Sequence, residues 1–325
     1  MWQRLNSMRA RLPHALLLQG KQGIGKLALA EAFAASLLCE SPTADGHACG
    51  SCGSCGWLSQ GNHPDFRYIE PEDAAEPEAA EGLGSEPKGR KKSHIAVDQI
   101  RALGETIGLS AHRQGYQVVL LHPAEALNQA AANALLKMLE EPPSGVVFLL
   151  VSHQPQRLLP TIRSRCHKLT LAPPKKETAL RWLETQSVKD ADFHLAQAGG
   201  APLEALAASL DRQDADQFVR LVSQAARIDP FEVSARWGRA GYLSIVILLQ
   251  KWIFDLASAR LSKVVRYYPD QEKLLHSLST KINLAGLLDY QRTLAEARGQ
   301  ASHPLNAELQ LEALFLRYSQ LFVTN

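Results

Sequence analysis

Three glycines and a lysine near the amino end have the spacing of a loop that binds phosphate. They are Gly20, Gly23, Gly25 and Lys26, in the pattern G-x-x-x-x-G-K. Backbone N–H groups of such a loop hold phosphate oxygens, and its lysine reaches the outer phosphates. The next residue is Leu27, where the motif has a serine or threonine that coordinates Mg²⁺. The sequence therefore predicts a phosphate loop without one metal ligand. A glycine turn that only packs a strand against a helix is the alternative.

The cysteines are the second group with a chemical pattern. Cys49, Cys52 and Cys55 follow one another at three-residue steps, and Cys39 precedes them. Four thiolates complete the tetrahedral coordination of Zn²⁺ and leave no open position, which is typical of a structural site. His47 is the alternative ligand to Cys39. An iron–sulfur cluster and free thiols are the alternatives to zinc, and the run lacks the Cys-Pro ending of bacterial ferredoxins.

A site that hydrolyses nucleotide also needs carboxylates at the end of a neighbouring strand, one to hold Mg²⁺ and one to orient water. The apolar run 118–121 predicts that strand, but His122 and Pro123 follow it. Glu125 is the nearest carboxylate and lies beyond the strand end. We therefore expect no hydrolysis at this site. An ATPase that uses Lys26 and Glu125 is the alternative.

An alternation of strands and helices would position these residues. The apolar run 15–19 before the phosphate loop predicts a buried strand, and 27–38 after it predicts a helix. Further strands are predicted at 65–69, 117–121, 146–151 and 169–171, and further helices at 97–107 and 129–140. This alternation indicates an α/β domain with a largely parallel sheet. The segment 70–93 is rich in charge, alanine, glycine and proline, so it is predicted to be a disordered surface loop.

No strand pattern recurs after Pro173 and Pro174. Short helices are predicted at 175–186, 191–198 and 202–210, and longer ones follow, for example at 243–261 and 305–322. We therefore expect a small helical domain and then a helical bundle, with a boundary near Asp211.

The composition is that of an ordinary soluble protein, with 46% hydrophobic and 21% charged residues and a net charge of +2. This balance gives no general attraction to nucleic acid or membrane. The first residues are charged and polar where a signal peptide needs an apolar stretch. The longest apolar run, 242–249, is shorter than a membrane span. We expect a cytoplasmic protein whose cysteines are thiols or metal ligands.

Two segments carry a specific family resemblance. They are 133–143, with the sequence NALLKMLEEPP, and 163–166, with the sequence RSRC. With the four cysteines, the strand end without carboxylates and the segment 303–309, HPLNAEL, the chain resembles the AAA+ clamp-loader family of bacterial DNA polymerase III. The resemblance runs from end to end apart from residues 70–93.

The resemblance implies a fold of three parts. An α/β AAA+ P-loop domain with a parallel sheet would occupy 1–172, with a zinc knuckle at 39–55 and the disordered loop at 70–93. A three-helix lid domain at 173–211 and an all-α helical collar at 212–325 would follow. The collar would hold a hetero-pentameric ring together.

The resemblance also implies roles for individual residues. Arg165 would be an arginine finger that acts in trans on ATP bound by a neighbouring gamma/tau subunit. A surface arginine that pairs with a carboxylate or a helix end near the sheet edge is the alternative. Leu203 stands where motor subunits of the family have an arginine that senses their own nucleotide. Lys137 and Arg101 match positions that contact the DNA backbone, and a solvated helix residue is the alternative for each. Lys26 and the glycines remain, so binding of ATP or ADP in the chain's own site stays open.

The implied function is that of a non-motor subunit that helps to load the sliding clamp on primed DNA during replication. Its partners would be gamma/tau subunits, the delta subunit, the sliding clamp and, through the assembled complex, primer–template DNA. It would belong to a DNA-directed DNA polymerase, a nucleotidyltransferase, without polymerase chemistry of its own. A self-sufficient ATPase and a zinc-dependent nucleic-acid-binding module are the alternatives. ATP turnover by the purified chain would indicate the first, and tight DNA binding that chelation abolishes would indicate the second.

Overall fold

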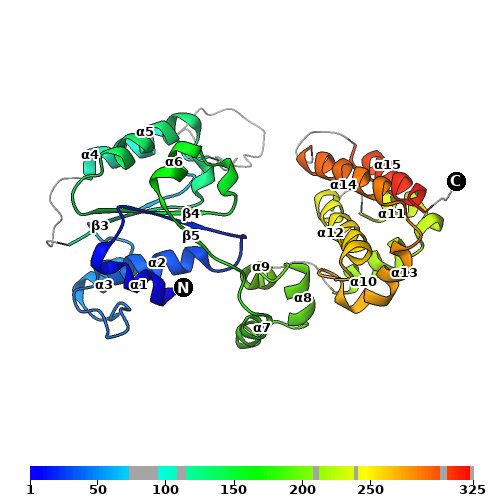
Figure 1. Cartoon of the computed structure of the whole chain (residues 1–325), viewed down its shortest axis with the longest axis horizontal. Helices are drawn as coiled ribbons and strands as arrows, with labels where there is room; N and C mark the ends of the chain where they lie inside the picture. The colour runs from blue at the N-terminus through cyan, green and yellow to red at the C-terminus, as the bar shows by residue number, and fades with distance from the viewer. Residues whose placement is uncertain (73–93, 108–114, 208–211, 238–240, 301–305, 323–325) are drawn as a thin grey trace, which may run out of the picture. The chain divides into compact units, whose positions relative to one another are not determined.

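Figure 1 shows the computed structural model, which describes residues 1–72, 94–107, 115–207, 212–237, 241–300 and 306–322. The chain divides into two compact units, Met1–Pro173 and Pro174–Asn325. The first unit combines a sheet with helices, and the described part of the second contains helices without strands. The predicted α/β class followed by a helical part is therefore confirmed. Most of the predicted loop 70–93 lies outside the described residues, and the division of the second unit into lid and collar stays a prediction.

The described residues of the first unit form a five-stranded parallel sheet in the order β2-β3-β4-β1-β5. Its strands are β1 (Ala15–Gln19), β2 (Phe66–Ile69), β3 (Gln117–Leu121), β4 (Val146–Ser152) and β5 (His167–Thr170). The inner strands are buried along nearly their whole length, which explains their continuous apolar sequences. β5 begins at His167, before the predicted start at Leu169. The reason is that this edge strand exposes His167 and Lys168, so no apolar pattern marks its beginning.

Helices cover both faces of the sheet (Figure 1). Side chains alternate along β1, so Leu17 packs with Phe148 on one face, whereas Leu16 packs with Phe33 of α2 on the other. Helices α4, α5 and α6 cover the first face, and α1 and α2 cover the second. The helices of this unit are α1 (Trp2–Ser7), η1 (Arg9–Arg11), α2 (Lys26–Leu38), α3 (Gly53–Ser59), α4 (Val97–Thr106), η2 (Ala124–Ala126), α5 (Gln129–Glu140), η3 (Pro155–Arg157) and α6 (Pro160–Arg165).

The short helix α3 has no counterpart in the helices predicted from the sequence. Its sequence, GSCGWLS, contains two glycines and no strong run of helix formers. The helix begins where the sulfur of Cys52 accepts a hydrogen bond from the backbone N–H of Cys55, which replaces the usual oxygen cap. The geometry of the cysteine loop therefore determines this helix.

The second unit consists of short and then longer helices. They are α7 (Lys176–Thr185), α8 (Ala191–Gln197), α9 (Pro202–Leu206), α10 (Arg212–Val222), η4 (Ala225–Arg227), α11 (Pro230–Trp237), α12 (Tyr242–Leu261), η5 (Pro269–Gln271), α13 (Glu272–Ser279), α14 (Leu284–Gly299) and α15 (Ala307–Gln320). Helices α7 to α9 share a small core that includes Leu183 and Leu195. The longer helices pack around Trp252, whose indole N–H donates to the hydroxyl of Tyr318 at 2.9 Å.

Helix α12 is the centre of the larger core. By length and composition it is one candidate for a membrane span among the described residues, yet 56% of its apolar window is buried inside the unit. The core helix of a globular domain has the same pattern, because it is apolar on all sides. Gln250 and Lys251 interrupt the run 242–249 in the sequence, and both side chains find hydrogen-bond partners inside the helical unit.

Candidate functional site

The phosphate loop connects β1 to α2 at the carboxyl edge of the sheet. Gly20 has φ +154°, and a Cβ at this position would lie 2.5 Å from the carbonyl oxygen of Leu171. Gly25 has φ +88° and forms the N-cap of α2. Both positions therefore need glycine, one because of a close approach and the other because of its left-handed backbone.

Lys26 does not extend freely into the loop. Its side chain is buried, and its Nζ donates to the backbone carbonyl of Lys21 at 2.5 Å. Burial lowers the pKa of Lys26 to about 8, and the negative charge of Glu125 partly opposes this shift. Leu27 packs against the apolar core beneath the sheet. The lysine of the motif is thus bonded to its own loop, and the following residue contributes to folding.

Two imidazoles and a carboxylate meet at the ends of β3 and β4. The Nε2 atoms of His122 and His153 are 3.1 Å apart. Burial lowers the pKa of both, that of His153 to about 4. Glu125 Oε1 accepts hydrogen bonds from the backbone N–H groups of His153 and Gln154 at 2.9 and 3.1 Å. The carboxylate whose charge acts on Lys26 therefore holds the end of β4, a contact that the sequence did not predict.

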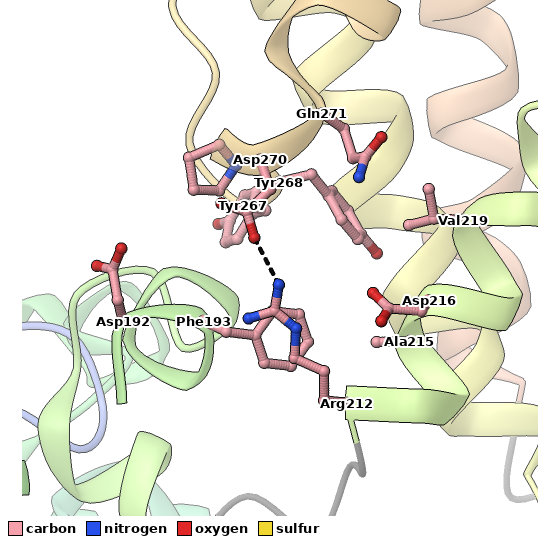
Figure 2. A pocket seen from close by; sticks show the side chains of 11 residues that line it. Asp192, Phe193, Arg212, Ala215, Asp216, Val219, Tyr267, Tyr268, Asp270 and Gln271 are labelled. Carbon is pink, nitrogen blue, oxygen red and sulfur yellow. Dashed lines mark hydrogen bonds and ion pairs between the residues drawn. The ribbon is translucent and has the colours of Figure 1, made fainter. Parts of the chain in front are cut away.

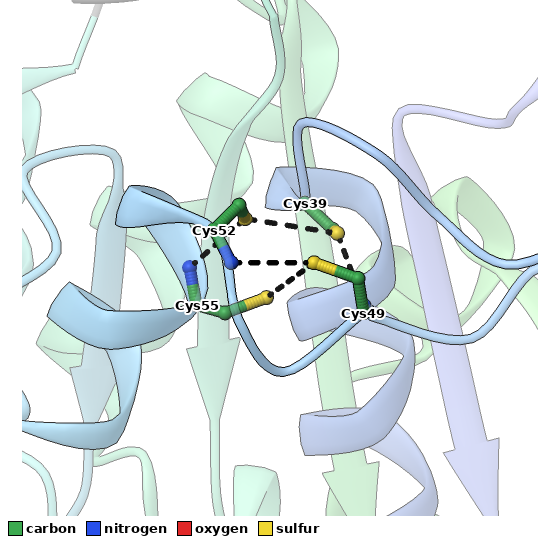
Figure 3. Close-up of side chains that lie close together, drawn as sticks. All are labelled: Cys39, Cys49, Cys52 and Cys55. Carbon is green, nitrogen blue, oxygen red and sulfur yellow. Dashed lines mark hydrogen bonds between the residues drawn. The ribbon is translucent and has the colours of Figure 1, made fainter.

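The four cysteines come together as predicted (Figure 3). Their sulfur atoms all lie within 4.8 Å of one another, with 3.9 Å between Cys39 and Cys52 and 4.0 Å between Cys49 and Cys55. Tetrahedral zinc with Zn–S bonds of about 2.3 Å places its sulfur ligands about 3.8 Å apart. The spacing therefore suits a metal ion held by four thiolates.

Backbone hydrogen bonds lower the pKa of Cys49 and Cys52 and so favour their thiolate forms, which bind metals. Backbone N–H groups of Ser51 and Cys52 lower the pKa of Cys49 to about 6. The Cys39 sulfur also accepts a hydrogen bond from the backbone N–H of Cys49 at 3.2 Å. Burial raises the pKa of Cys55 to about 12, so a metal ion would have to displace that proton.

His47, the alternative ligand, has another contact. Its ring stacks on the indole of Trp2, with centroids 4.1 Å apart and planes 5° from parallel. The indole N–H donates to the carbonyl of Asp45 at 3.0 Å. The amino-terminal helix therefore holds the loop before the cysteine run. Among the residues that the structure describes, the group with metal-binding geometry contains cysteines alone.

A buried pair joins the cysteine loop to the core. Ser54 Oγ donates to the carbonyl of Leu38 and lies 2.6 Å from His63 Nε2. His63 Nδ1 accepts the backbone N–H of Asp65 at 3.0 Å, so in the neutral ring Nε2 carries the proton and donates to Ser54. Sequence spacing gives no signal for this pair.

Arg165 is the last residue of α6. Its Nη2 lies 2.6 Å from Glu140 Oε1, and its Nη1 donates to the carbonyl of Thr161 at 3.1 Å. The side chain remains 36% exposed. The next residue, Cys166, is buried in the core on that face of the sheet, and burial raises its pKa to about 11. Glu140 ends α5, and no pattern in the sequence marks it as a partner of Arg165.

The remaining predicted residues lie on exposed surfaces. Lys137 on α5 is exposed, and so is Arg101 on the neighbouring helix α4. Arg101 also forms an ion pair with Asp98 at 3.5 Å. Leu203 is the second residue of α9 and is 40% exposed.

A small pocket lies in the helical unit among α8, α10 and η5 (Figure 2). Arg212 extends into it and donates to Asp270 at 2.8 Å, while its guanidinium lies 4.8 Å from the ring centroid of Phe193. Asp190 is 3.8 Å from the same guanidinium. These contacts pair the guanidinium of Arg212 and connect α8 to α10. The pocket therefore lies where the short helices pack against the long ones.

Comparison with known proteins gives one consistent family. The family described as "DNA polymerase III, delta subunit" matches residues 2–175. DNA polymerase III subunit delta' of Pseudomonas aeruginosa is 37% identical over 99% of this chain and 96% of its own length. DNA polymerase III subunit delta' of Escherichia coli is 39% identical over 60% of this chain and 54% of its own length. DNA polymerase III subunit gamma/tau of Mycobacterium bovis is 35% identical over 60% of this chain and 32% of its own length.

Proposed function

The chain belongs to the family of DNA polymerase III delta prime subunits, and on this premise we propose that it is a non-motor subunit of the AAA+ clamp loader. In this role it helps to load the sliding clamp on primed DNA during replication. Its chemical contribution is an arginine finger: Arg165 completes the ATP site of a neighbouring gamma/tau subunit. The observation that carries the proposal is the position of Arg165, which is partly exposed at the end of α6 with N–H donors to spare.

The chemistry of a finger suits this side chain. A guanidinium brought across an interface stabilises the charge that develops on the transferred phosphate, and such fingers contribute about 10³ to 10⁵ in rate. Arg165 has five N–H donors and uses two of them in the contacts with Glu140 and Thr161. The other donors remain for a phosphate from outside the chain.

The chain's own phosphate loop supports the non-motor role. Leu27 offers no metal ligand, His122 and Pro123 replace the carboxylates at the end of β3, and Glu125 braces β4. Leu203 replaces the arginine that would sense nucleotide from the lid. The proposal therefore assigns no hydrolysis to this chain and leaves it the role of a fixed partner for active subunits.

The same proposal names the partners and the metal. The partners are gamma/tau subunits, one of which is represented among the relatives, together with the delta subunit and the sliding clamp. The chain would contact primer–template DNA as part of the assembled ring in the cytoplasm. The side chains of Lys137 and Arg101 would bind phosphates of the DNA backbone without reading bases. Zn²⁺ bound by Cys39, Cys49, Cys52 and Cys55 would stabilise the knuckle and take no part in catalysis.

Reconstituted rings test the finger. Arg165→Ala should impair the one ATP site that Arg165 faces, so the total ATP hydrolysis of the ring should fall by at least the contribution of that site. The ring should still assemble. Arg157→Ala removes an exposed arginine from the nearby turn η3 and serves as the matched control. Normal hydrolysis by rings with Arg165→Ala would contradict the assignment. ATP turnover by the purified chain that Lys26→Ala abolishes would favour the self-sufficient ATPase instead.

A further inference from the structure

The ion pair between Arg165 and Glu140 joins the ends of two helices on one face of the sheet. Glu140 is the last residue of α5, and Arg165 is the last residue of α6, which packs against α5. The distance from Nη2 to Oε1 is 2.6 Å, and the two side chains are 36% and 44% exposed. The pair therefore lies at the surface, where a neighbouring subunit has access to it.

Stability does not explain this pair. Exposed ion pairs contribute little to folding, because water and salt screen them and two long side chains lose freedom. A carboxylate at the carboxyl end of a helix is also unfavourable, because the last carbonyl groups carry partial negative charge there. Glu140 occupies that position in α5, and Glu141 follows it. Folding stability therefore gives no reason for a glutamate at position 140.

The contacts of Arg165 define that orientation. Its Nη1 donates to the carbonyl of Thr161 one turn back on α6, and its Nη2 faces Glu140 across the gap to α5. Two contacts on different nitrogens restrain the rotation of a planar guanidinium. The backbone behind it is also held, because the side chain of Cys166 is buried in the core. The unused N–H donors consequently have a defined direction before any partner arrives.

We propose that Glu140 is a positioning residue for Arg165, which it holds in the orientation needed to reach the γ-phosphate of ATP on an adjacent subunit. This inference rests on the proposed function of Arg165. A restrained guanidinium loses less freedom when it meets the phosphate, so part of the ordering is complete before the transition state forms. Glu140 itself touches no substrate.

The test uses the assembled ring and compares variants of Glu140 and Glu141. The relevant quantity is the Arg165-dependent turnover. For each variant, it is the difference in ATP hydrolysis between the ring that keeps Arg165 and the same ring with Arg165→Ala. Glu140→Ala should lower this turnover about 10-fold, a small part of what a finger contributes. The KM for ATP should not change. Glu140→Gln keeps one acceptor oxygen and should restore part of the loss. Glu141→Ala removes the same charge from the next residue and should have no effect.

A double variant separates positioning from a second, independent effect. In rings that already carry Arg165→Ala, adding Glu140→Ala should change nothing, because the residue acts only through the arginine. A further loss in that background would overturn the proposal, and so would equal effects of Glu140→Ala and Glu141→Ala.

If Arg165→Ala itself leaves hydrolysis unchanged, the finger assignment fails and the positioning role fails with it. If Arg165→Ala lowers hydrolysis and Glu140→Ala does not, only the positioning role fails. The melting temperature and assembly of each variant show that the chain is folded, and Glu140→Gln replaces Glu140→Ala if the latter does not assemble.

Discussion

His122 and His153 meet edge to face at the carboxyl ends of two neighbouring strands, with 3.1 Å between their Nε2 atoms. One of these nitrogens donates and the other accepts, so the contact needs at least one deprotonated nitrogen. The charges around the pair are those of Lys26, Glu125 and Glu70. Burial is the largest cause of the lowered pKa of both rings, and the positive charge of Lys26 lowers each pKa further.

This pair predicts a loss of stability in mild acid. A histidine of the unfolded chain has a pKa of about 6.5, whereas that of folded His153 is about 4, so between these values the unfolded state binds more protons. The free energy of unfolding should be at its full value above about pH 6.5. We expect it to fall by about 1 to 2 kcal/mol towards pH 4, a figure reduced for partial exposure. Urea unfolding at a series of pH values measures this.

A substitution shows whether the pair causes that loss. His153→Gln removes the titrating ring, so the fall between pH 6.5 and 4 should become shallower. His167→Gln removes a histidine from the exposed edge strand β5 and is the control. An identical pH profile for the unchanged chain and His153→Gln would contradict the prediction.

The cysteine group predicts one tightly held zinc ion per chain. Cys49→Ser removes one of four ligands and should weaken metal binding by more than the 10- to 100-fold typical of outer partners, as measured by competition with a coloured chelator. Cys166→Ala alters a buried cysteine outside the group and should leave the metal content unchanged. Iron with visible absorption, in place of colourless zinc, would favour the cluster alternative.

The phosphate loop predicts that one restored ligand does not restore an ATPase. Leu27→Thr supplies the missing hydroxyl, but His122 and Pro123 still occupy the end of β3. We expect no ATP turnover above background by the purified variant. Because Leu27 packs against the core, the change should also cost about 1 to 2 kcal/mol of stability. Turnover that depends on Mg²⁺ would show that Glu125 is able to replace the missing carboxylates.

The buried contacts of Asp255 predict a large effect of substituting this residue in the helical unit. Its fully buried carboxylate accepts backbone N–H groups of Arg266, Tyr267 and Tyr268 at 2.8 to 2.9 Å. Asp255→Ala leaves these donors without their acceptor and should cost about 2 to 5 kcal/mol. Asp289→Ala breaks an exposed pair with Arg292 and should cost less than about 0.5 kcal/mol. Urea midpoints of both variants measure the difference, and similar values would contradict it.

Local patterns were sufficient for the strands and for most helices. The strands β1, β3 and β4 are buried on both faces, so they appear in the sequence as continuous apolar runs. The patterns give the edge strand β5 too late a start, and they miss the short helices α1, α3 and α6. In β5 exposure removes the apolar pattern, and in α3 hydrogen bonds to cysteine sulfur replace intrinsic helix preference.

The sequence by itself determined which groups are candidates for chemistry: the glycines and Lys26 of the phosphate loop, the four cysteines, and the arginine before Cys166. Spacing was enough because each of these motifs is local or nearly so. Only the tertiary structure decided what these groups contact. Glu140 meets Arg165 because α5 and α6 pack on the same face of the sheet, and Glu125 reaches the end of β4 because β3 and β4 are neighbours. Such contacts depend on how elements distant in the chain pack together, and no local spacing records them.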